Sequence, residues 1–226
     1  MAPALAMLQL ADAAAPAPLV AVVGPVLAVG LMGVAMIAAA AAGRMWIGVA
    51  LALLAGFGLL ILARALGLPP LPHPLSTGFA VVIASISFAV RGALFAKSAS
   101  DKGWLIAVSV VAGETAILFT AAAMPEALPD WLLALLPAQW ASTAIQTAIS
   151  GSGTQAAIWP LFALAGTAAA TLVVVRLWPR RWPYLIMFSA WLALSALVWH
   201  QPGASSPDAA PAFAADGVLL EGKSLN

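Results

Sequence analysis

The chain has no cysteine and only two histidines. The missing cysteine excludes disulfide bonds, thiolate metal sites and a cysteine nucleophile. The histidines, His73 and His200, are far apart and fall in separate predicted loops, so no transition-metal cluster is indicated. The sequence also contains no paired carboxylate motif and no phosphate-binding loop. We therefore predict no catalytic residue, no cofactor and no metal site.

Charge is also scarce, since 8% of the residues are charged and 64% are apolar. A soluble domain has about 25% charged and roughly 45–50% apolar residues. So little charge cannot cover a water-facing surface, and the composition therefore predicts a protein whose main partner is the lipid bilayer. A formal net charge of +1 gives no indication of nucleic-acid binding.

Long apolar runs fill most of the chain. A helix needs about 20 apolar residues, rising about 1.5 Å each, to cross a hydrocarbon core roughly 30 Å thick. We predict an all-α integral membrane protein, a bundle of six transmembrane helices plus one amphipathic interfacial or re-entrant helix. The predicted spans are 19–42, 46–66, 77–96, 103–124, 156–178 and 183–200.

The segments outside these spans are rich in alanine and proline. Residues 1–18 indicate a loosely ordered N-terminus, and with no Lys or Arg before Arg44 they lack the basic region of a signal peptide. Residues 201–226 indicate a disordered C-terminal tail. Four prolines within 67–76 predict an extended loop between the second and third spans.

Residues 131–150 form the ambiguous element, because Pro137 interrupts their apolar run after less than two turns. After this proline, uncharged polar side chains recur on one helical face: Gln139, Thr143, Gln146 and Ser150. The pattern predicts an amphipathic helix. This helix could lie flat in the interface with Trp131 and Trp140 at headgroup level, re-enter the membrane, or face a polar cavity.

Small residues recur every four positions on the first two predicted helices. They are Ala35, Ala39 and Gly43 on the first, and Gly48, Ala52 and Gly56 on the second. Such residues let helix backbones approach closely in lipid, so we predict close packing of this pair. The alternative is that a chain rich in alanine produces the spacing by chance.

The distribution of Lys and Arg indicates orientation, because basic residues near span ends collect on the cytoplasmic side. With six spans, seven of the nine basic residues share one side, and only Arg64 and Lys223 fall on the other. The seven are Arg44, Arg91, Lys97, Lys102, Arg176, Arg180 and Arg181. We therefore predict a plasma (inner) membrane protein with both termini on the non-cytoplasmic side. A further span at 131–150 would move three arginines across the membrane and remove this bias.

A basic and aromatic cluster follows the fifth predicted span. Its members are Arg176, Arg180, Arg181, Trp178 and Trp182. Arginines interleaved with tryptophans are typical of a membrane interface, so we predict that this cluster orients the protein and binds anionic headgroups.

Glu114 is the acidic residue that we place deep inside the membrane, at a cost of about 2.5–3.5 kcal/mol on insertion scales. One interpretation is a proton- or cation-handling group, or a polar anchor for a partner helix. The other is a protonated side chain hydrogen-bonded to Ser85, Ser87 or Ser109. Arg91 lies about 9 Å away along the hairpin, and we expect it to extend instead toward the cytoplasmic headgroups.

Two function classes follow. The first is a non-enzymatic accessory or assembly subunit that binds partner membrane helices, further copies of itself, or lipid. The second is a small transporter or ion path, with Glu114 as its protonatable group and an outer vestibule lined by Gln139, Thr143 and Gln146. An enzyme is a distant third class, because Gly151-Ser152-Gly153 lacks the wider motif of a membrane serine protease. A polar cavity that reaches Glu114 would favour transport.

Overall fold

The computed structural model describes residues 17–124, 128–151, 154–178 and 182–200, and every regular element in this part of the chain is a helix. Ala17 and Pro18, expected in a loose N-terminus, belong to the first described helix. The predictions for residues 1–16, for the tail 201–226, and for Arg180 and Arg181 lie outside the described residues.

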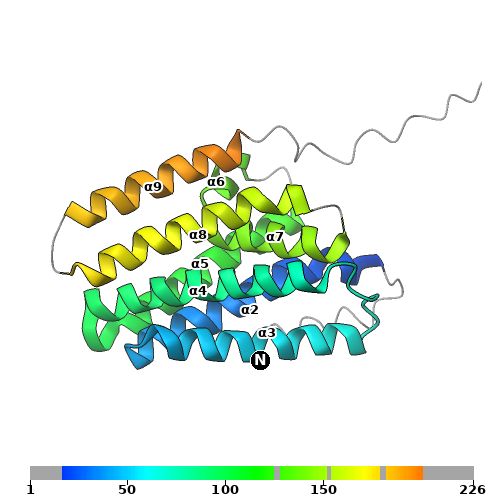
Figure 1. Ribbon diagram of the computed structural model, residues 1–226, viewed down its shortest axis with the longest axis horizontal. Coiled ribbons are helices and arrows are strands. Elements are labelled where there is room, and N and C mark those ends of the chain that lie inside the picture. The colour runs from blue at the N-terminus through cyan, green and yellow to red at the C-terminus, as the bar shows by residue number, and fades with distance from the viewer. Residues whose placement is uncertain (1–16, 125–127, 152–153, 179–181, 201–226) are drawn as a thin grey trace, which may run out of the picture.

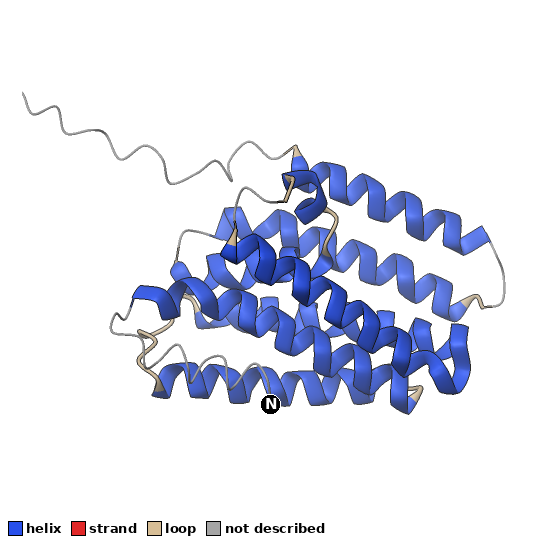
Figure 2. Ribbon diagram, turned by 180° about the vertical axis from the view of Figure 1, so that it is seen from behind, coloured by secondary structure: helices blue, strands red, loops and turns tan. Residues whose placement is uncertain are grey.

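The described elements are joined in simple chain order. They are α2 (Ala17–Ala42), α3 (Met45–Ala65), α4 (Pro74–Ala99), the 3-10 turn η1 (Ser100–Lys102), α5 (Gly103–Ala123), α6 (Asp130–Ala134), α7 (Pro137–Ser150), α8 (Thr154–Arg176) and α9 (Trp182–Trp199). Figures 1 and 2 show the long helices lying side by side along the long axis of the molecule.

The apolar helices make the chain a helical membrane protein. By length and composition, four stretches of the described residues could cross a bilayer: Val22–Ala42, Met45–Ala65, Pro74–Ala123 and Ala157–Arg176. The third combines α4, η1 and α5, and the apolar part of α9, Tyr184–Trp199, is shorter than these four. The described part of the chain therefore has four candidate spans and not the six that were predicted. Helices α4 and α5 form one continuous apolar stretch, and the apolar part of α9 is short.

Helix α2 is the centre of the bundle. It has no charged residue and contacts α3, α4, α5 and α7. A helix that is apolar on all sides is stable only when it is surrounded by other apolar groups. Its fully buried side chains accordingly point in several directions: Leu27, Ala28, Leu31, Met32, Ala35, Met36 and Ala39.

Small residues bring two helices against the backbone of α2. A Cβ atom placed on Gly48 of α3 would lie 2.5 Å from the carbonyl oxygen of Ala35 and 2.7 Å from the Cβ of Ala39. Gly92 of α4 packs equally closely against the carbonyl oxygen of Met36. The close packing predicted from the small residues of the first two helices is therefore confirmed at Gly48.

Helix α2 continues through the Gly24-Pro25 pair, although proline has no N–H and disturbs the hydrogen bonds of the preceding turn. The N–H of Gly24 donates to Oε1 of Gln146 in α7 at 3.0 Å. A side chain at position 24 would meet this amide oxygen at 2.5 Å. The irregular turn of α2 is therefore stabilised by a side chain that is distant in sequence.

We predict that Gly48→Ala destabilises the bundle by about 1–3 kcal/mol, because the new methyl group meets a backbone carbonyl that cannot rotate away. The matched control is Gly58→Ala on the same helix, where an added Cβ has nothing within 4 Å. The control variant should be as stable as the parent or slightly more so. Thermal unfolding in detergent measures both, and equal stability of the two variants would contradict the packing argument.

Candidate functional site

Helix α7 lies inside the bundle, where it contacts α2, α4 and α8. Pro137 occupies its first turn, where a missing N–H costs nothing, and Gly151 ends it with a left-handed φ of 72°. Most of its residues are buried: Pro137, Ala138, Trp140, Ala141, Ser142, Ala144, Ile145, Ala148 and Ile149. Its alanine-rich side allows close packing against three neighbouring helices, so α7 is a packed element of the bundle, and the interfacial, re-entrant and cavity-facing positions considered for it stay predictions.

Helix α7 is short and extends along only part of the bundle. With 14 residues it is about 21 Å long, roughly half the length of α4. It begins beside Glu114, near the middle of α5, and ends where Gly151 approaches Pro72 in the loop between α3 and α4. Figure 1 shows α7 along one half of the molecule only.

Glu114 caps the N-terminus of α7 from another helix. Its Oε2 accepts a hydrogen bond from the N–H of Ala138 at 3.1 Å. The first amides of a helix have no partner within that helix, and Leu136 at the N-cap position provides no side-chain acceptor. The positive end of the helix dipole also favours an acidic group at this place. Glu114 thus joins α5 to α7 by a hydrogen bond.

The carbonyl groups just before α7 are also satisfied by side chains. We call residues 134–138 the α6–α7 break. The indole N–H of Trp140 donates to the carbonyl of Ala134 at 2.9 Å, and that of Trp191 in α9 donates to Leu135 at 3.2 Å. Trp140 is therefore a buried hydrogen-bond donor and not the headgroup residue considered from the sequence.

The serines expected near Glu114 have other partners. Ser85 donates to the carbonyl of Val81 at 2.7 Å, and Ser109 donates to that of Leu105 at 3.0 Å. Both bonds run one turn back along the same helix, which is the nearest acceptor for a helical serine. Among the described hydrogen bonds, the partner of the Glu114 carboxylate is the backbone amide of Ala138. A backbone partner was not among those expected from the sequence.

Arg91 does not extend to the headgroups as expected. Its Nη1 donates to Oγ of Ser87 at 3.1 Å, and its Nη2 donates to Oγ1 of Thr167 in α8 at 2.9 Å. The guanidinium carbon lies 5.8 Å from the ring centre of Phe88. Helical side chains lean toward the N-terminus, so the guanidinium of Arg91 is directed one turn back along α4, toward Ser87.

Ser87 joins this second polar centre, since its hydroxyl donates to the carbonyl of Leu164 at 3.2 Å. Arg91 and Glu114 influence each other as charges, but each makes its described hydrogen bonds to different helices. Each group therefore has its own hydrogen-bond partners, in line with the sequence, which placed them about 9 Å apart along the hairpin and did not pair them. Thr167 was missed by sequence reasoning, although Thr167 and Thr171 are spaced one helical turn apart within an apolar span.

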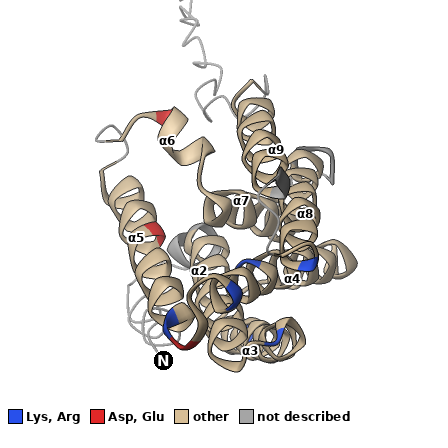
Figure 3. Cartoon of the chain, turned by 90° about the vertical axis from the view of Figure 1, so that its left-hand side faces the viewer, with Lys and Arg blue, Asp and Glu red and all other residues tan. Residues whose placement is uncertain are grey.

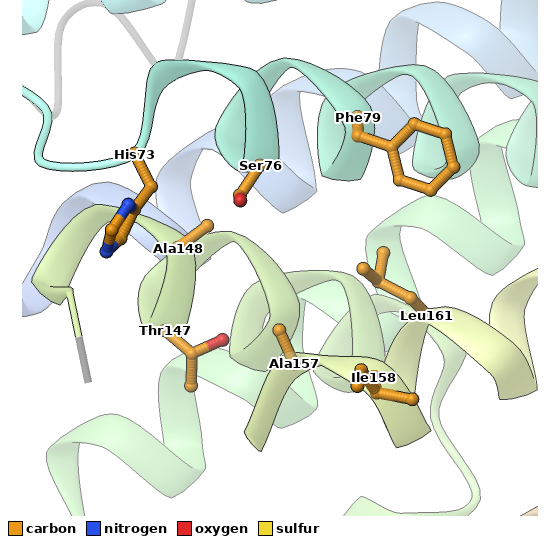
Figure 4. A pocket seen from close by; sticks show the side chains of 8 residues that line it. All are labelled: His73, Ser76, Phe79, Thr147, Ala148, Ala157, Ile158 and Leu161. Carbon is orange, nitrogen blue, oxygen red and sulfur yellow. The ribbon is translucent and has the colours of Figure 1, made fainter. Parts of the chain in front are cut away.

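Two cavities of about 190 Å³ each lie between the described helices. The first, shown in Figure 4, has His73 and Thr147 toward one end and Phe79 and Leu161 toward the other. The second lies between α4, α8 and α9, and is lined by Arg91, Leu94, Phe95, Thr167, Thr171, Met187, Phe188 and Trp191. Glu114 lines neither of them.

The polar face of α7 is used within the bundle. Gln146 binds Gly24, as described above, and Thr143 donates to the carbonyl of Gln139 at 3.0 Å. The side chains of Gln139, Thr143 and Gln146 are half-buried, and none of them lines either cavity. The vestibule predicted from this face is therefore not formed by the described cavities.

Figure 3 views the bundle from one end, with the positions of its charged residues in colour. Of the basic and aromatic cluster, the side chains of Arg176 and Trp178 are described by the structure. Lys97 donates to the carbonyl of Val175 at 2.7 Å, close to the C-terminus of α8, where a cation is favoured by the helix dipole. Arg176 is exposed in the same turn, and the rings of Trp178 and Tyr184 meet edge to face at 5.9 Å.

Scans of the chain against protein-family models, curated proteins and solved structures find no match. The candidate site is therefore defined by its own geometry, with two polar centres in an otherwise apolar bundle. The first is Glu114 at the α6–α7 break, and the second is Arg91 with its hydroxyl partners.

We predict that Glu114→Leu destabilises the protein by about 1–3 kcal/mol, because the amide of Ala138 loses its acceptor in an apolar interior. Hydrogen exchange of the Ala138 amide should become faster, and chemical unfolding should shift to lower denaturant. The neighbouring Thr115→Val is the control, since the buried hydroxyl of Thr115 has no hydrogen-bond partner among the described residues. Unchanged exchange in Glu114→Leu would show that the cap contributes nothing.

Proposed function

We propose that this chain is a non-enzymatic accessory or assembly subunit of the plasma (inner) membrane that binds partner helices or lipid. The observation that carries the proposal is the hydrogen bond between Glu114 and Ala138. A carboxylate that caps a buried helix has a structural role, and that role accounts for its cost in the membrane. Neither described cavity offers this carboxylate a path for ions.

The outer surface supports binding as the activity. Large apolar side chains are exposed on α3 and α9, the two helices at the edges of the bundle: Trp46, Leu54, Phe57, Ile61, Leu185, Phe188 and Leu192. Only 22% of the residues in the apolar stretch of α3 are buried. Such a helix is covered by lipid, by another membrane protein or by a second copy of this chain.

A small transporter is the second candidate, and a re-entrant path for α7 would favour it. In several transporter folds, broken helices direct their N-termini at an anionic substrate near the middle of the membrane. Here the anionic group at that position is the protein's own Glu114. An ion path would therefore have to displace this carboxylate from its helix cap.

We further propose six crossings, formed by α2, α3, α4, α5, α8 and α9, with α6 and α7 re-entering from the non-cytoplasmic side. The alternating course of these helices places Arg44, Lys97, Lys102 and Arg176 at the same end of the bundle. By the positive-inside rule this end is cytoplasmic and both termini lie on the opposite side. The exposed Arg64 is at the other end of α3.

The decisive test of the function is Glu114→Gln, because the amide oxygen still accepts the N–H of Ala138 but the side chain cannot ionise. For an accessory subunit, the variant should retain its stability within about 0.5 kcal/mol. It should also co-purify with the same membrane proteins after cross-linking in native membranes. In proteoliposomes with a pH-sensitive dye, parent and variant should both lack proton flux. Proton flux in the parent that Glu114→Gln abolishes would establish the transporter instead.

The topology predicts opposite signals from two reporter fusions. A fusion after Lys97 should be active as a cytoplasmic reporter, and a fusion after Asn226 should be active as a reporter outside the cytoplasm. The reason is that six crossings return the chain to the side on which it began. Equal signals from the two fusions would exclude the proposed arrangement.

A further inference from the structure

We infer that the cavity between α4, α8 and α9 binds the carboxylate of a long-chain fatty acid through Arg91. This inference rests on the proposed function, since it names one lipid class that such a subunit would hold. It concerns a different polar centre from Glu114 and so has its own test.

The charge of Arg91 provides the first argument. Its described hydrogen bonds go to the neutral hydroxyls of Ser87 and Thr167. The carboxylate of Glu114 acts on it electrostatically, but the hydrogen bond described for that carboxylate comes from Ala138. A cation inside a membrane protein is costly unless an anion or several strong acceptors compensate it. Because Arg91 also lines the cavity, a bound anion can reach its remaining N–H groups. A guanidinium binds a carboxylate with two parallel hydrogen bonds, which suits this position.

The walls of the cavity provide the second argument. Apart from Arg91 and two threonines, they are apolar or aromatic: Leu94, Phe95, Met187, Phe188 and Trp191. The volume of about 190 Å³ corresponds to roughly six water molecules at about 30 Å³ each. It is below the roughly 300 Å³ at which cavities enclose a whole small ligand. The cavity can therefore hold a polar head and its first methylene groups, while the chain remains in the bilayer.

Depth distinguishes a fatty acid from a phospholipid. Ser87 lies 12 residues before Ala99, about 18 Å from the end of α4, and Thr167 lies about 14 Å from the end of α8. The phosphates of phospholipids lie outside the hydrocarbon core, well above this guanidinium. A single-chain acid can reach it, because its carboxyl group enters the core in the neutral form and releases its proton to water when the carboxylate pairs with the guanidinium.

The peripheral position of α9 provides an entrance. This helix contacts α8 and α6, and its Trp191 is attached to the α6–α7 break through Leu135. Phe188 lies one turn before Trp191 on α9, and it lines the cavity although its side chain is exposed. A chain can therefore pass from the lipid between α9 and α4 toward Arg91.

The test uses the full-length protein in nanodiscs and oleate labelled with ¹³C at its carboxyl carbon. Oleate should bind the parent with a shifted carboxyl resonance, and Arg91→Gln should weaken binding about ten-fold or more. Arg64→Gln, which removes an exposed arginine in the last turn of α3, should leave binding unchanged. Met187→Trp fills the cavity from α9 and keeps Arg91, so it should abolish binding even if Arg91→Gln fails to fold.

Competitors separate the carboxylate from other ligands. Oleyl alcohol should compete about ten-fold more weakly than oleate, because it has the chain without the charge. The inference is overturned if the alcohol competes equally, if phosphatidylglycerol, chloride or a quinone displaces oleate more strongly, or if Arg91→Gln binds like the parent. If the parent does not bind oleate but Glu114→Gln still co-purifies with its membrane partners, this ligand is excluded and the accessory function is retained. Proton flux through Glu114 would remove the accessory function without affecting the oleate result.

Discussion

A helix that begins inside a membrane bundle needs partners for the polar groups of its backbone, because no water is available there. The α6–α7 break meets this requirement with three side chains from different parts of the chain. Glu114 accepts the first free amide of α7, while Trp140 and Trp191 donate to the carbonyls of Ala134 and Leu135. The position of α7 depends on these bonds. Gln146 of α7 in turn accepts the N–H of Gly24, next to Pro25 in α2.

The charged residues inside the bundle each join two of its helices by hydrogen bonds. Glu114 attaches α7 to α5, and Arg91 attaches α8 to α4 through the hydroxyls of Ser87 and Thr167. Apolar surface cannot give helices a register in lipid, because the lipid tails are equally apolar. A few polar contacts and the close approaches at Gly48 and Gly92 provide that register.

The interactions that these few polar groups already make also bear on function. A residue that is fully used as a helix cap is poorly placed to carry ions, which favours a binding role for the chain over transport. Arg91 differs from Glu114, because its cation faces a cavity that is large enough for the polar head of a lipid. The exposed apolar surfaces of α3 and α9 are consistent with a protein that works through its contacts in the membrane.

The sequence by itself determined the helices, since runs of about 20 apolar residues can be stable in lipid only as helices. It also indicated the break at Pro137, the close contact at Gly48, and Glu114 as the residue out of place. Only the tertiary structure decided the burial of α7, the direction of Arg91 and the partner of Glu114. The physical reason is that the decisive hydrogen bonds join residues 24, 76 and 122 positions apart. Helical periodicity describes one helix at a time and cannot indicate which backbone group of another helix lies opposite.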